Sequence, residues 1–263
     1  MTGGGKGLAL VTGASGGIGA ELARAFAAHG HDLALTARSE ERLDLVADDV
    51  AGRWGVRVSV LPLDLGRREA PAELLEWTRA EGLQVHHLVN NAGYGLTGPF
   101  GAHSLDEEMG LVDLNVRALT ELTHRFLPGI VEGRGGVLNV ASLAAYLPGP
   151  FMASYYASKA YVLSFTEALA REHAASGASA TALCPGPVPT GFQERSGMRL
   201  PRMARHMPML TAAEVARQGY AAYRRRQTVC VPGFSTRLGA SLLGAAPRSL
   251  TARLSERLNR IRS

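Results

Sequence analysis

Short apolar runs alternate along the chain with longer segments in which apolar residues recur every three or four positions. The first run covers residues 8–11 and leads through a glycine-rich turn into a helical pattern, which begins at Gly17 and stops at Gly30. Unbroken runs of this kind are typical of strands buried on both faces of a parallel sheet. Long helices are predicted at about 105–130 and 151–172. Further strands are predicted at residues 32–36, 56–61, 84–89, 136–140, 178–183 and 229–231.

This alternation of strand and helix predicts an α/β fold of the Rossmann type, a doubly wound parallel sheet with helices on both faces. The 263 residues suit a single dinucleotide-binding and catalytic domain, 1–263, and no stretch of the sequence marks a linker. In such a fold, ligands bind at the carboxyl ends of the strands. We therefore expect the functional residues to follow the predicted strands directly.

The composition is that of a folded globule, because hydrophobic residues make up 46% of the chain and charged residues only 19%. No apolar run approaches the ~20 residues of a membrane span, and the glycine-rich start lacks the apolar segment of a signal peptide. Cys184 and Cys230 lie in predicted core strands, where we expect reduced thiols. These features together favour a soluble protein of the cytoplasm, and we expect no metal site.

The net charge of +5 hides an asymmetry between two parts of the chain. Residues 1–194 carry a net charge of −7, whereas residues 195–263 carry +12, with 14 arginines against two glutamates. A basic segment of this kind attracts anionic partners, such as a phosphate-bearing substrate, an acidic protein or a membrane surface. The alternative is a solvated arginine surface without a specific partner, and we expect no nucleic acid partner.

The segment at about 236–263 is predicted to be a basic helical tail. Within it, Leu250, Leu254, Leu258 and Ile261 recur at helical spacing among arginines, the pattern of an amphipathic helix. Such a helix could contact a membrane surface or an acidic partner. It could equally pack over the substrate cleft or against a neighbouring subunit.

The turn after the first strand, residues 12–19, has its glycines in the spacing G-x-x-x-G-x-G. Glycines permit a tight turn, and they let a pyrophosphate approach the backbone N–H groups at the positive end of the next helix. Arg38 follows the second strand, where a dinucleotide fold contacts the adenosine ribose. Arginine there suits the 2′-phosphate of NADP better than the 2′-hydroxyl of NAD. Alternatively, Arg38 is a surface residue beside the helix cap Ser39.

Polar residues also follow the third and fourth predicted strands. Asp64 could accept a hydrogen bond from an adenine amino group, or it could cap a helix that begins near Arg67. The segment 90–93 (Asn-Asn-Ala-Gly) consists of small residues that allow a ligand to approach the backbone closely. Both segments extend the predicted ligand site along the sheet edge.

The predicted chemistry lies in residues 141–159. Tyr155 and Lys159 are four apart, so on a helix they share one face. An ammonium ~4 Å from a phenol in a partly screened site can lower the phenol's pKa from ~10 toward ~7. Ser142, at the end of the fifth strand, adds a hydroxyl. Helical spacing alone leaves Tyr156 as an alternative proton donor, because it lies three residues before Lys159.

These motifs at these mutual distances resemble the short-chain dehydrogenase/reductase family, over residues 8 to about 232. The chain is similar to the subgroup of roughly 250 residues and looks most like bacterial 3-oxoacyl and hydroxysteroid reductases. In that family the serine lies thirteen residues before the tyrosine, a spacing that Ser142 and Tyr155 match. The resemblance implies an NADP(H)-dependent oxidoreductase that interconverts a ketone or aldehyde and an alcohol on an apolar small molecule.

The resemblance also implies roles for individual residues. Tyr155 is then the general acid, Ser142 orients the carbonyl, and Lys159 holds the nicotinamide ribose and lowers the phenol's pKa. Asn115 is implied to support a water that relays protons. The implied cofactor-binding residues are Gly13, Ser15, Gly17, Ile18, Gly19, Arg38, Asp64, Asn91, Ala92, Gly93, Tyr155, Lys159, Pro185, Gly186, Val188 and Thr190.

One departure from the family pattern bears on the cofactor. Many NADP-preferring relatives carry a basic residue after the serine of the glycine motif, but here that position is Gly16, so the NADP preference rests on Arg38 alone. Residues of about 191–210 resemble the variable substrate lid. A homodimer or homotetramer through the two long helices is also implied. The main rival interpretation is a nucleotide-binding regulatory or scaffold protein without turnover.

Overall fold

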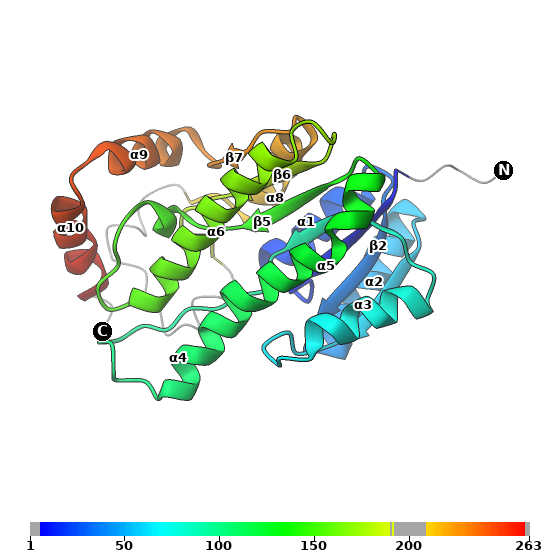
Figure 1. Cartoon of the computed structure of the whole chain (residues 1–263), viewed down its shortest axis with the longest axis horizontal. Helices are drawn as coiled ribbons and strands as arrows, with labels where there is room; N and C mark the ends of the chain where they lie inside the picture. Colours follow the sequence, from blue (N-terminus) through cyan, green and yellow to red (C-terminus); the bar gives the residue numbers. More distant parts are fainter. Residues whose placement is uncertain (1–5, 190, 192–208, 261–263) are drawn as a thin grey trace.

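Seven parallel strands form a single sheet in this computed structural model, which describes residues 6–189, 191 and 209–260 (Figure 1). Their order, β3-β2-β1-β4-β5-β6-β7, is that of a doubly wound Rossmann sheet, so the predicted fold class is confirmed. The strands are β1 (Leu8–Thr12), β2 (Asp32–Ala37), β3 (Val58–Pro62), β4 (Val85–Asn90), β5 (Gly136–Val140), β6 (Ser179–Leu183) and β7 (Val229–Cys230).

Helices cover both faces of the sheet, and each face has its own buried apolar cluster. In β1, Ala9 and Val11 pack into one cluster and Leu10 into the other, because successive side chains of a strand point to opposite faces. The first face carries α1 (Gly17–Ala27), α2 (Glu40–Trp54) and α8 (Ala212–Arg224). The second carries α3 (Ala70–Ala80), α5 (Leu119–Glu132) and α6 (Ala153–Glu172).

The long helix predicted at about 105–130 is interrupted in the structure. It consists of α4 (Leu105–Val112), a π-helical turn at Asp113–Ala118 and α5. Within the π turn, the Asn115 side chain makes two hydrogen bonds with the backbone of Tyr94, which fix it on the side of the sheet edge. Apolar periodicity predicted the helix but not this turn, because a π turn leaves the apolar pattern nearly unchanged. Such π turns often mark functional sites.

The chain ends in two helices beyond β7, α9 (Phe234–Ala245) and α10 (Arg248–Arg260), which form an arm at one end of the molecule (Figure 1). The predicted helical tail is therefore present, with Pro247 at the break between the helices. On α10 the buried residues are polar, namely Thr251, Ser255 and Asn259. Leu250 and Leu254, in the predicted apolar stripe, are exposed by 60% and 48%.

Thr190, Ile261 and almost all of the predicted lid at 191–210 lie outside the described residues. Cys184, directly after β6, and Cys230, in β7, are buried free cysteines. None of the helices in the described part of the chain is long and apolar enough to cross a bilayer.

Candidate active site

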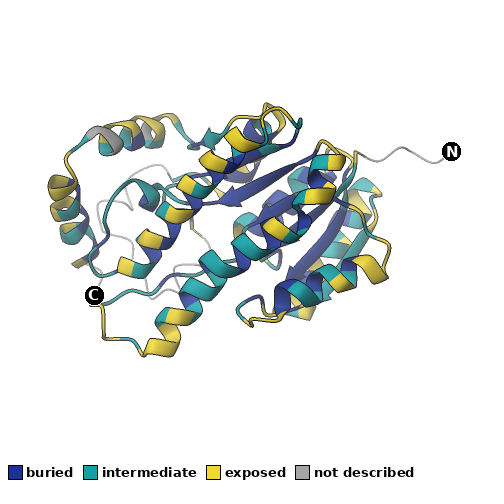
Figure 2. Cartoon of the chain, viewed as in Figure 1, coloured by how far each residue is buried: buried dark blue, intermediate teal, exposed yellow. Residues whose placement is uncertain are grey.

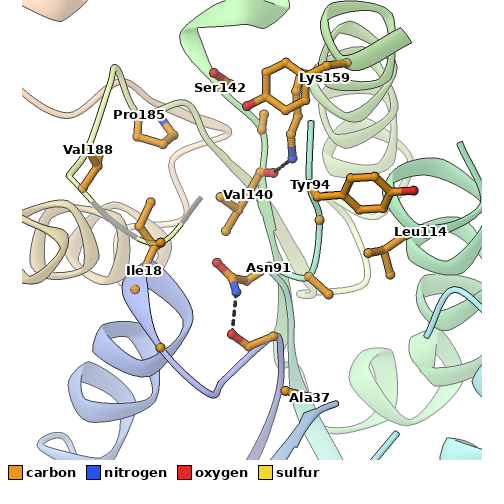
Figure 3. Close-up of a pocket in the computed structure, with 18 of the residues that line it drawn as sticks. Ile18, Ala37, Asn91, Tyr94, Leu114, Val140, Ser142, Lys159, Pro185 and Val188 are labelled. Atoms are coloured by element: carbon orange, nitrogen blue, oxygen red, sulfur yellow. Dashed lines mark hydrogen bonds between the residues drawn. The ribbon is translucent and has the colours of Figure 1, made fainter. Parts of the chain in front are cut away.

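A cleft of about 1590 Å³ runs along the carboxyl ends of the strands. It begins beside β2 and the glycine turn, passes β4 and β5, and ends at leucines of the arm formed by α9 and α10. Figure 3 shows part of its lining, with Ala37 at one end and Ser142 and Lys159 at the other. The cleft is long enough to bring the predicted cofactor residues and the predicted catalytic residues into one space.

The glycine turn between β1 and α1 is held by Asn91. The Asn91 Nδ2 donates to the carbonyl oxygens of Thr12 and Gly13 at 3.0 and 3.1 Å (Figure 3). These bonds connect the Asn91 side chain to the end of β1 and the start of the turn. The turn requires glycine at two positions, because φ is 64° at Gly13 and 56° at Gly17. Asn91, which the family resemblance implies to be a cofactor-binding residue, therefore also builds the turn itself.

The beginning of α1 fits a pyrophosphate. Its N-cap residue, Gly16, has no side chain to satisfy the first N–H groups of the helix, and an added methyl group there would meet open space. Such uncapped N–H groups at a helix N-terminus attract anions. Ser15, Gly17 and Ile18 line the cleft as predicted, whereas Gly19 does not line it. A methyl group at Gly19 would instead strike the Gly13 carbonyl, so this glycine permits close packing of the turn.

Arg38 and Asp64 face the far end of the cleft. Arg38 is exposed and follows β2 directly, while the neighbouring Ser39 caps α2 by accepting from the Arg42 N–H at 3.4 Å. Asp64 accepts from the Gly66 N–H at 3.0 Å. The nearest helix begins only at Ala70, so the interpretation of Asp64 as its cap is wrong. Arg42, which the sequence analysis missed, also lines this end.

Ser142 and Tyr155 meet at the carboxyl end of β5. Tyr155 projects from the first turns of α6, is 8% exposed, and forms a side-chain hydrogen bond with Ser142. Burial raises the pKa of Tyr155 to about 12, although the bond with Ser142 acts in the opposite direction. The phenol is therefore protonated at neutral pH and is placed beside a second hydroxyl.

Lys159 lies one turn further along α6, and its ammonium is held by a backbone carbonyl. The Nζ donates to the carbonyl oxygen of Val140 at 2.8 Å and lies 5.9 Å from the centre of the Tyr155 ring (Figure 3). Burial lowers the pKa of Lys159 to about 8. In this structure burial dominates the pKa of the phenol and the Val140 carbonyl holds the ammonium, and the lowering of that pKa by Lys159 stays a prediction.

Asn115 supports the site from below rather than lining it. Its side chain is 1% exposed, and its Nδ2 donates to the Tyr94 carbonyl at 2.9 Å and to the Ser158 Oγ at 3.1 Å. Ser158 in turn donates to the Tyr155 carbonyl at 2.7 Å. Asn115 therefore ties the π turn to the helix that carries Tyr155. The water relay implied for Asn115 stays a prediction.

Tyr156 takes a different direction from Tyr155. The two rings are nearly perpendicular, at 79°, and the Tyr156 hydroxyl donates to the Asn259 Oδ1 on α10 at 3.4 Å. Its partner is thus the C-terminal arm, whereas Tyr155 bonds with Ser142. This geometry favours Tyr155 as the proton donor, in agreement with the spacing to Ser142.

The remaining predicted residues fall into two groups. Ala92, Gly93, Pro185, Gly186 and Val188 line the cleft, and Thr190 lies outside the described residues. The sequence left open that the basic helical tail packs over the cleft, and leucines of the arm do line it, together with apolar residues from outside the arm that were not predicted. They are Leu143, Leu147, Leu243, Leu254 and Leu258, together with Tyr94 and Leu114.

A Rossmann sheet with a glycine turn and a Ser–Tyr–Lys group at its carboxyl edge defines the class of dinucleotide-dependent oxidoreductases. The family model described as short chain dehydrogenase matches residues 7–199. The chain belongs to this short-chain dehydrogenase family.

Relatives of known sequence support the assignment. A very-long-chain 3-oxoacyl-CoA reductase of Anas platyrhynchos is 35% identical over 195 residues, which are 72% of this chain and 62% of that protein. The chain thus spans less than two thirds of that relative. A short chain dehydrogenase of Pseudocercospora fijiensis is 34% identical over 85% of this chain and 72% of its own length.

Solved structures show the same architecture. A short-chain dehydrogenase from Sphingobium yanoikuyae in complex with NADPH has a TM-score of 0.80 and 30% identity, covering 92% of this chain and 97% of that one. A family member from Burkholderia phymatum in complex with NAD has a TM-score of 0.79 and 26% identity, covering 92% and 94%. The two cofactors among these neighbours leave the choice between NADP and NAD to the residues of this chain.

Proposed function

We propose that this protein reduces an apolar ketone or aldehyde to the alcohol with NADPH, using Tyr155 as the proton donor. The observation that carries this proposal is the buried Tyr155 phenol, hydrogen-bonded to Ser142 in a cleft that also contains the glycine turn. A phenol and a hydroxyl that converge on one point can both donate to a carbonyl oxygen.

A nicotinamide cofactor held in this cleft would supply the hydride for the carbonyl carbon. Ser142 and Tyr155 hold the carbonyl oxygen, and Tyr155 gives it the phenolic proton, which is then replaced from solvent. Burial raises the pKa of Tyr155 and so keeps that proton on the phenol at neutral pH, the protonation state that donation to a carbonyl oxygen requires. Lys159, held by the Val140 carbonyl at the floor of the cleft, is placed to orient the nicotinamide ribose.

The preference for NADP rests on Arg38. Its exposed guanidinium follows β2 at the end of the cleft, where a 2′-phosphate would lie, and Arg42 lies one turn into the next helix. A guanidinium binds phosphate through charge-assisted hydrogen bonds. The NADPH complex of the Sphingobium neighbour supports this choice, although the Burkholderia neighbour holds NAD.

An apolar substrate is proposed because leucines line the end of the cleft near Ser142. Leu143 and Leu147 follow β5, and Leu243, Leu254 and Leu258 come from the arm. The names of the relatives, among them a very-long-chain 3-oxoacyl-CoA reductase and a ketoacyl reductase, agree with a keto group on an apolar chain. The rival interpretation, a scaffold without turnover, does not require Ser142, Tyr155 and Lys159 to be retained together.

The test is consumption of NADPH or NADH by the purified protein with a panel of carbonyl compounds of increasing chain length. We expect turnover with NADPH that becomes more efficient as the chain lengthens. Tight NADPH binding without turnover of any carbonyl compound would favour the scaffold interpretation. A clear preference for short polar aldehydes would contradict the proposed substrate class.

We also propose self-association through the outer face of α5 and α6. Figure 1 shows these helices side by side on one face of the sheet. Tyr161 on α6 is 38% exposed, stacks on Phe165 and contacts the Thr120 hydroxyl of α5 at 2.9 Å, which presents a flat, partly apolar surface. Light scattering that gives the mass of a monomer at micromolar concentration would refute it.

A further inference from the structure

Exposed apolar side chains are concentrated on the arm formed by α9 and α10. Half of the ten large hydrophobic side chains that are exposed in the described residues lie on these two helices. On α9, Phe234, Leu238 and Leu242 are four residues apart, so they share one helix face, and they are exposed by 81%, 55% and 65%. Leu250 and Leu254 repeat the spacing on α10.

Because α10 is attached through polar side chains, Leu250 and Leu254 remain exposed. Ser255 donates to the Pro148 carbonyl, and Asn259 donates to the Pro150 carbonyl at 2.8 Å. The polar side of the helix is thus used for packing on the loop before α6, an inversion of the usual arrangement of a surface helix. Figure 2 shows the outer side of α10 coloured as exposed.

The same arm is basic. Residues 234–260 contain five arginines and a single acidic residue, Glu256, which pairs with Arg260. Arg237, Arg248, Arg253 and Arg257 are all exposed. An exposed apolar face bordered by arginines is complementary to a bilayer with anionic headgroups, because the arginines attract the headgroups while the apolar side chains enter the interface.

The apolar face also reaches the cleft. Leu254 is 48% exposed and at the same time lines the cleft, together with Leu243 and Leu258 of the same arm. An acidic protein partner would use the arginines but would not require apolar residues that continue into a substrate site. This continuity favours a lipid surface as the occupant.

We propose that α9 and α10 dock the protein on an anionic lipid bilayer through Phe234, Leu238, Leu242, Leu250 and Leu254. The arginines of the arm contact the headgroups, and the bound orientation turns the leucine-lined end of the cleft toward the lipid. Entry of an apolar substrate directly from the bilayer rests on the proposed function, whereas the docking itself does not.

The experiment is co-sedimentation of the full chain with vesicles of phosphatidylcholine alone or with added phosphatidylserine. We expect binding to the anionic vesicles that is at least about tenfold stronger than to neutral ones at low salt and that weakens as salt is added. Leu238→Gln with Leu242→Gln should reduce it about tenfold, since both side chains are exposed and their replacement leaves the core intact. Arg248→Glu with Arg253→Glu should abolish the preference for anionic lipid.

Matched variants elsewhere serve as controls. Leu105→Gln with Met109→Gln changes two exposed apolar residues of α4, and Arg68→Glu with Arg79→Glu changes two exposed arginines at and before α3. Neither pair should weaken binding by more than about twofold. An equal loss in the controls would show attraction by net charge or general stickiness and would overturn the proposal.

Two further outcomes would also overturn it. Absence of binding to anionic vesicles at low salt would leave the arm as a solvated surface. If the protein does not bind vesicles and the double variant Leu238→Gln with Leu242→Gln has a lower particle mass than the unmodified protein, the apolar face joins two copies of the chain. All of these readouts are independent of turnover, so a failure of the docking is distinguishable from a failure of the proposed reduction.

Discussion

The glycine turn at the start of α1 and the arm at the end of the chain are both short segments beside the same cleft, yet they are held in opposite ways. The turn lies against buried strands, and Asn91 and Thr12 link β1 to β4 through bonds of 3.0 to 3.1 Å. The arm presents leucines to solvent and is attached through Ser255 and Asn259, which bond to carbonyls of a loop.

The comparison of the turn with the arm shows under which conditions the apolar residues of a segment are the buried ones. In the sheet, backbone pairing and side-chain burial require the same register, so the apolar residues of β1 are the buried ones. On α10, the neighbouring loop offers unpaired carbonyl groups, so hydrogen-bond donors occupy the contact and Leu250 and Leu254 remain outside. A turn built on backbone contacts should therefore tolerate change poorly, and the exposed face of the arm should tolerate it well.

In the comparison of the turn with the arm, the largest effect is expected at Gly19. A methyl group there would collide with the Gly13 carbonyl, so Gly19→Ala should weaken NADPH binding by about 100-fold, or roughly 3 kcal/mol. Gly52→Ala, at an exposed position of α2 away from the cleft, is the matched control, because its methyl group would meet open space. Fluorescence titration of NADPH checks both. Equal affinities in the two variants would show that the turn is not as tightly fixed as the structure indicates.

A buried histidine, His31, lies near the C-terminal end of α1, so the stability of this region can be tested by lowering the pH. Phe26 packs edge-on against Tyr220, whose hydroxyl bonds with the Nε2 of His31 at 3.0 Å. Burial, the main cause, together with the charge of His87, lowers the pKa of His31 from 6.5 to about 4. The folded state therefore binds this proton less readily than the unfolded state, and stability is complete above pH 6.5 and lost as the pH falls toward 4.

This single group should cost about 2 to 3 kcal/mol of unfolding free energy across that interval. His31→Gln keeps a hydrogen-bonding side chain but does not titrate, so its stability should fall less between pH 7 and pH 4.5. His124→Gln, at an exposed histidine of α5, is the control and should match the unmodified protein. Denaturant unfolding at several pH values measures all three, and parallel pH profiles would contradict the prediction.

A smaller effect is expected at Arg38, at the far end of the cofactor region. Arg38→Asp removes the guanidinium and places a carboxylate where a 2′-phosphate is proposed, so NADPH binding should weaken by about 30-fold, roughly 2 kcal/mol. NADH binding should stay the same or improve. If the unmodified protein already binds NADH as tightly as NADPH, Arg38 does not select the cofactor.

The smallest effect is expected on α10, where replacing a buried polar residue should cost more stability than replacing an exposed leucine. Asn259 is fully buried and bonded to the Pro150 carbonyl, so Asn259→Leu should destabilise the attachment of α10 by about 1 to 2 kcal/mol. Leu250→Gln changes an exposed residue and should be nearly neutral. Hydrogen exchange of the α10 amides would separate the two, and a stabilising Asn259→Leu would mean that the helix packs through its leucines.

The fold could be predicted because each strand of the sheet carries its own signal. Apolar runs bounded by glycine or by polar residues located the strands to within about two residues, and β5 was predicted at its observed bounds, Gly136–Val140. The π turn could not be predicted from apolar periodicity. It depends on contacts between Asn115 and Tyr94, which are distant in the sequence.

Spacing in the sequence located some of the site residues but did not show the contacts of others. Spacing located Ser142 and Tyr155, which the structure brings together, and the glycines of the turn. Spacing did not show that the Val140 carbonyl holds Lys159, since that bond depends on how β5 and α6 pack. Spacing left open whether the basic tail packs over the cleft, and the structure places Leu243, Leu254 and Leu258 in its lining, along a path set by hydrogen bonds that no local pattern encodes.

The central claim, that Tyr155 is the proton donor of a carbonyl reductase, is tested most directly by comparing two single-atom changes in adjacent residues. NADPH-dependent turnover should fall about 10²- to 10⁴-fold in Tyr155→Phe, with the dissociation constant for NADPH nearly unchanged. Tyr156→Phe should retain most of the turnover, because its hydroxyl contacts Asn259 of the arm. An active Tyr155→Phe variant beside an inactive Tyr156→Phe variant would contradict the account.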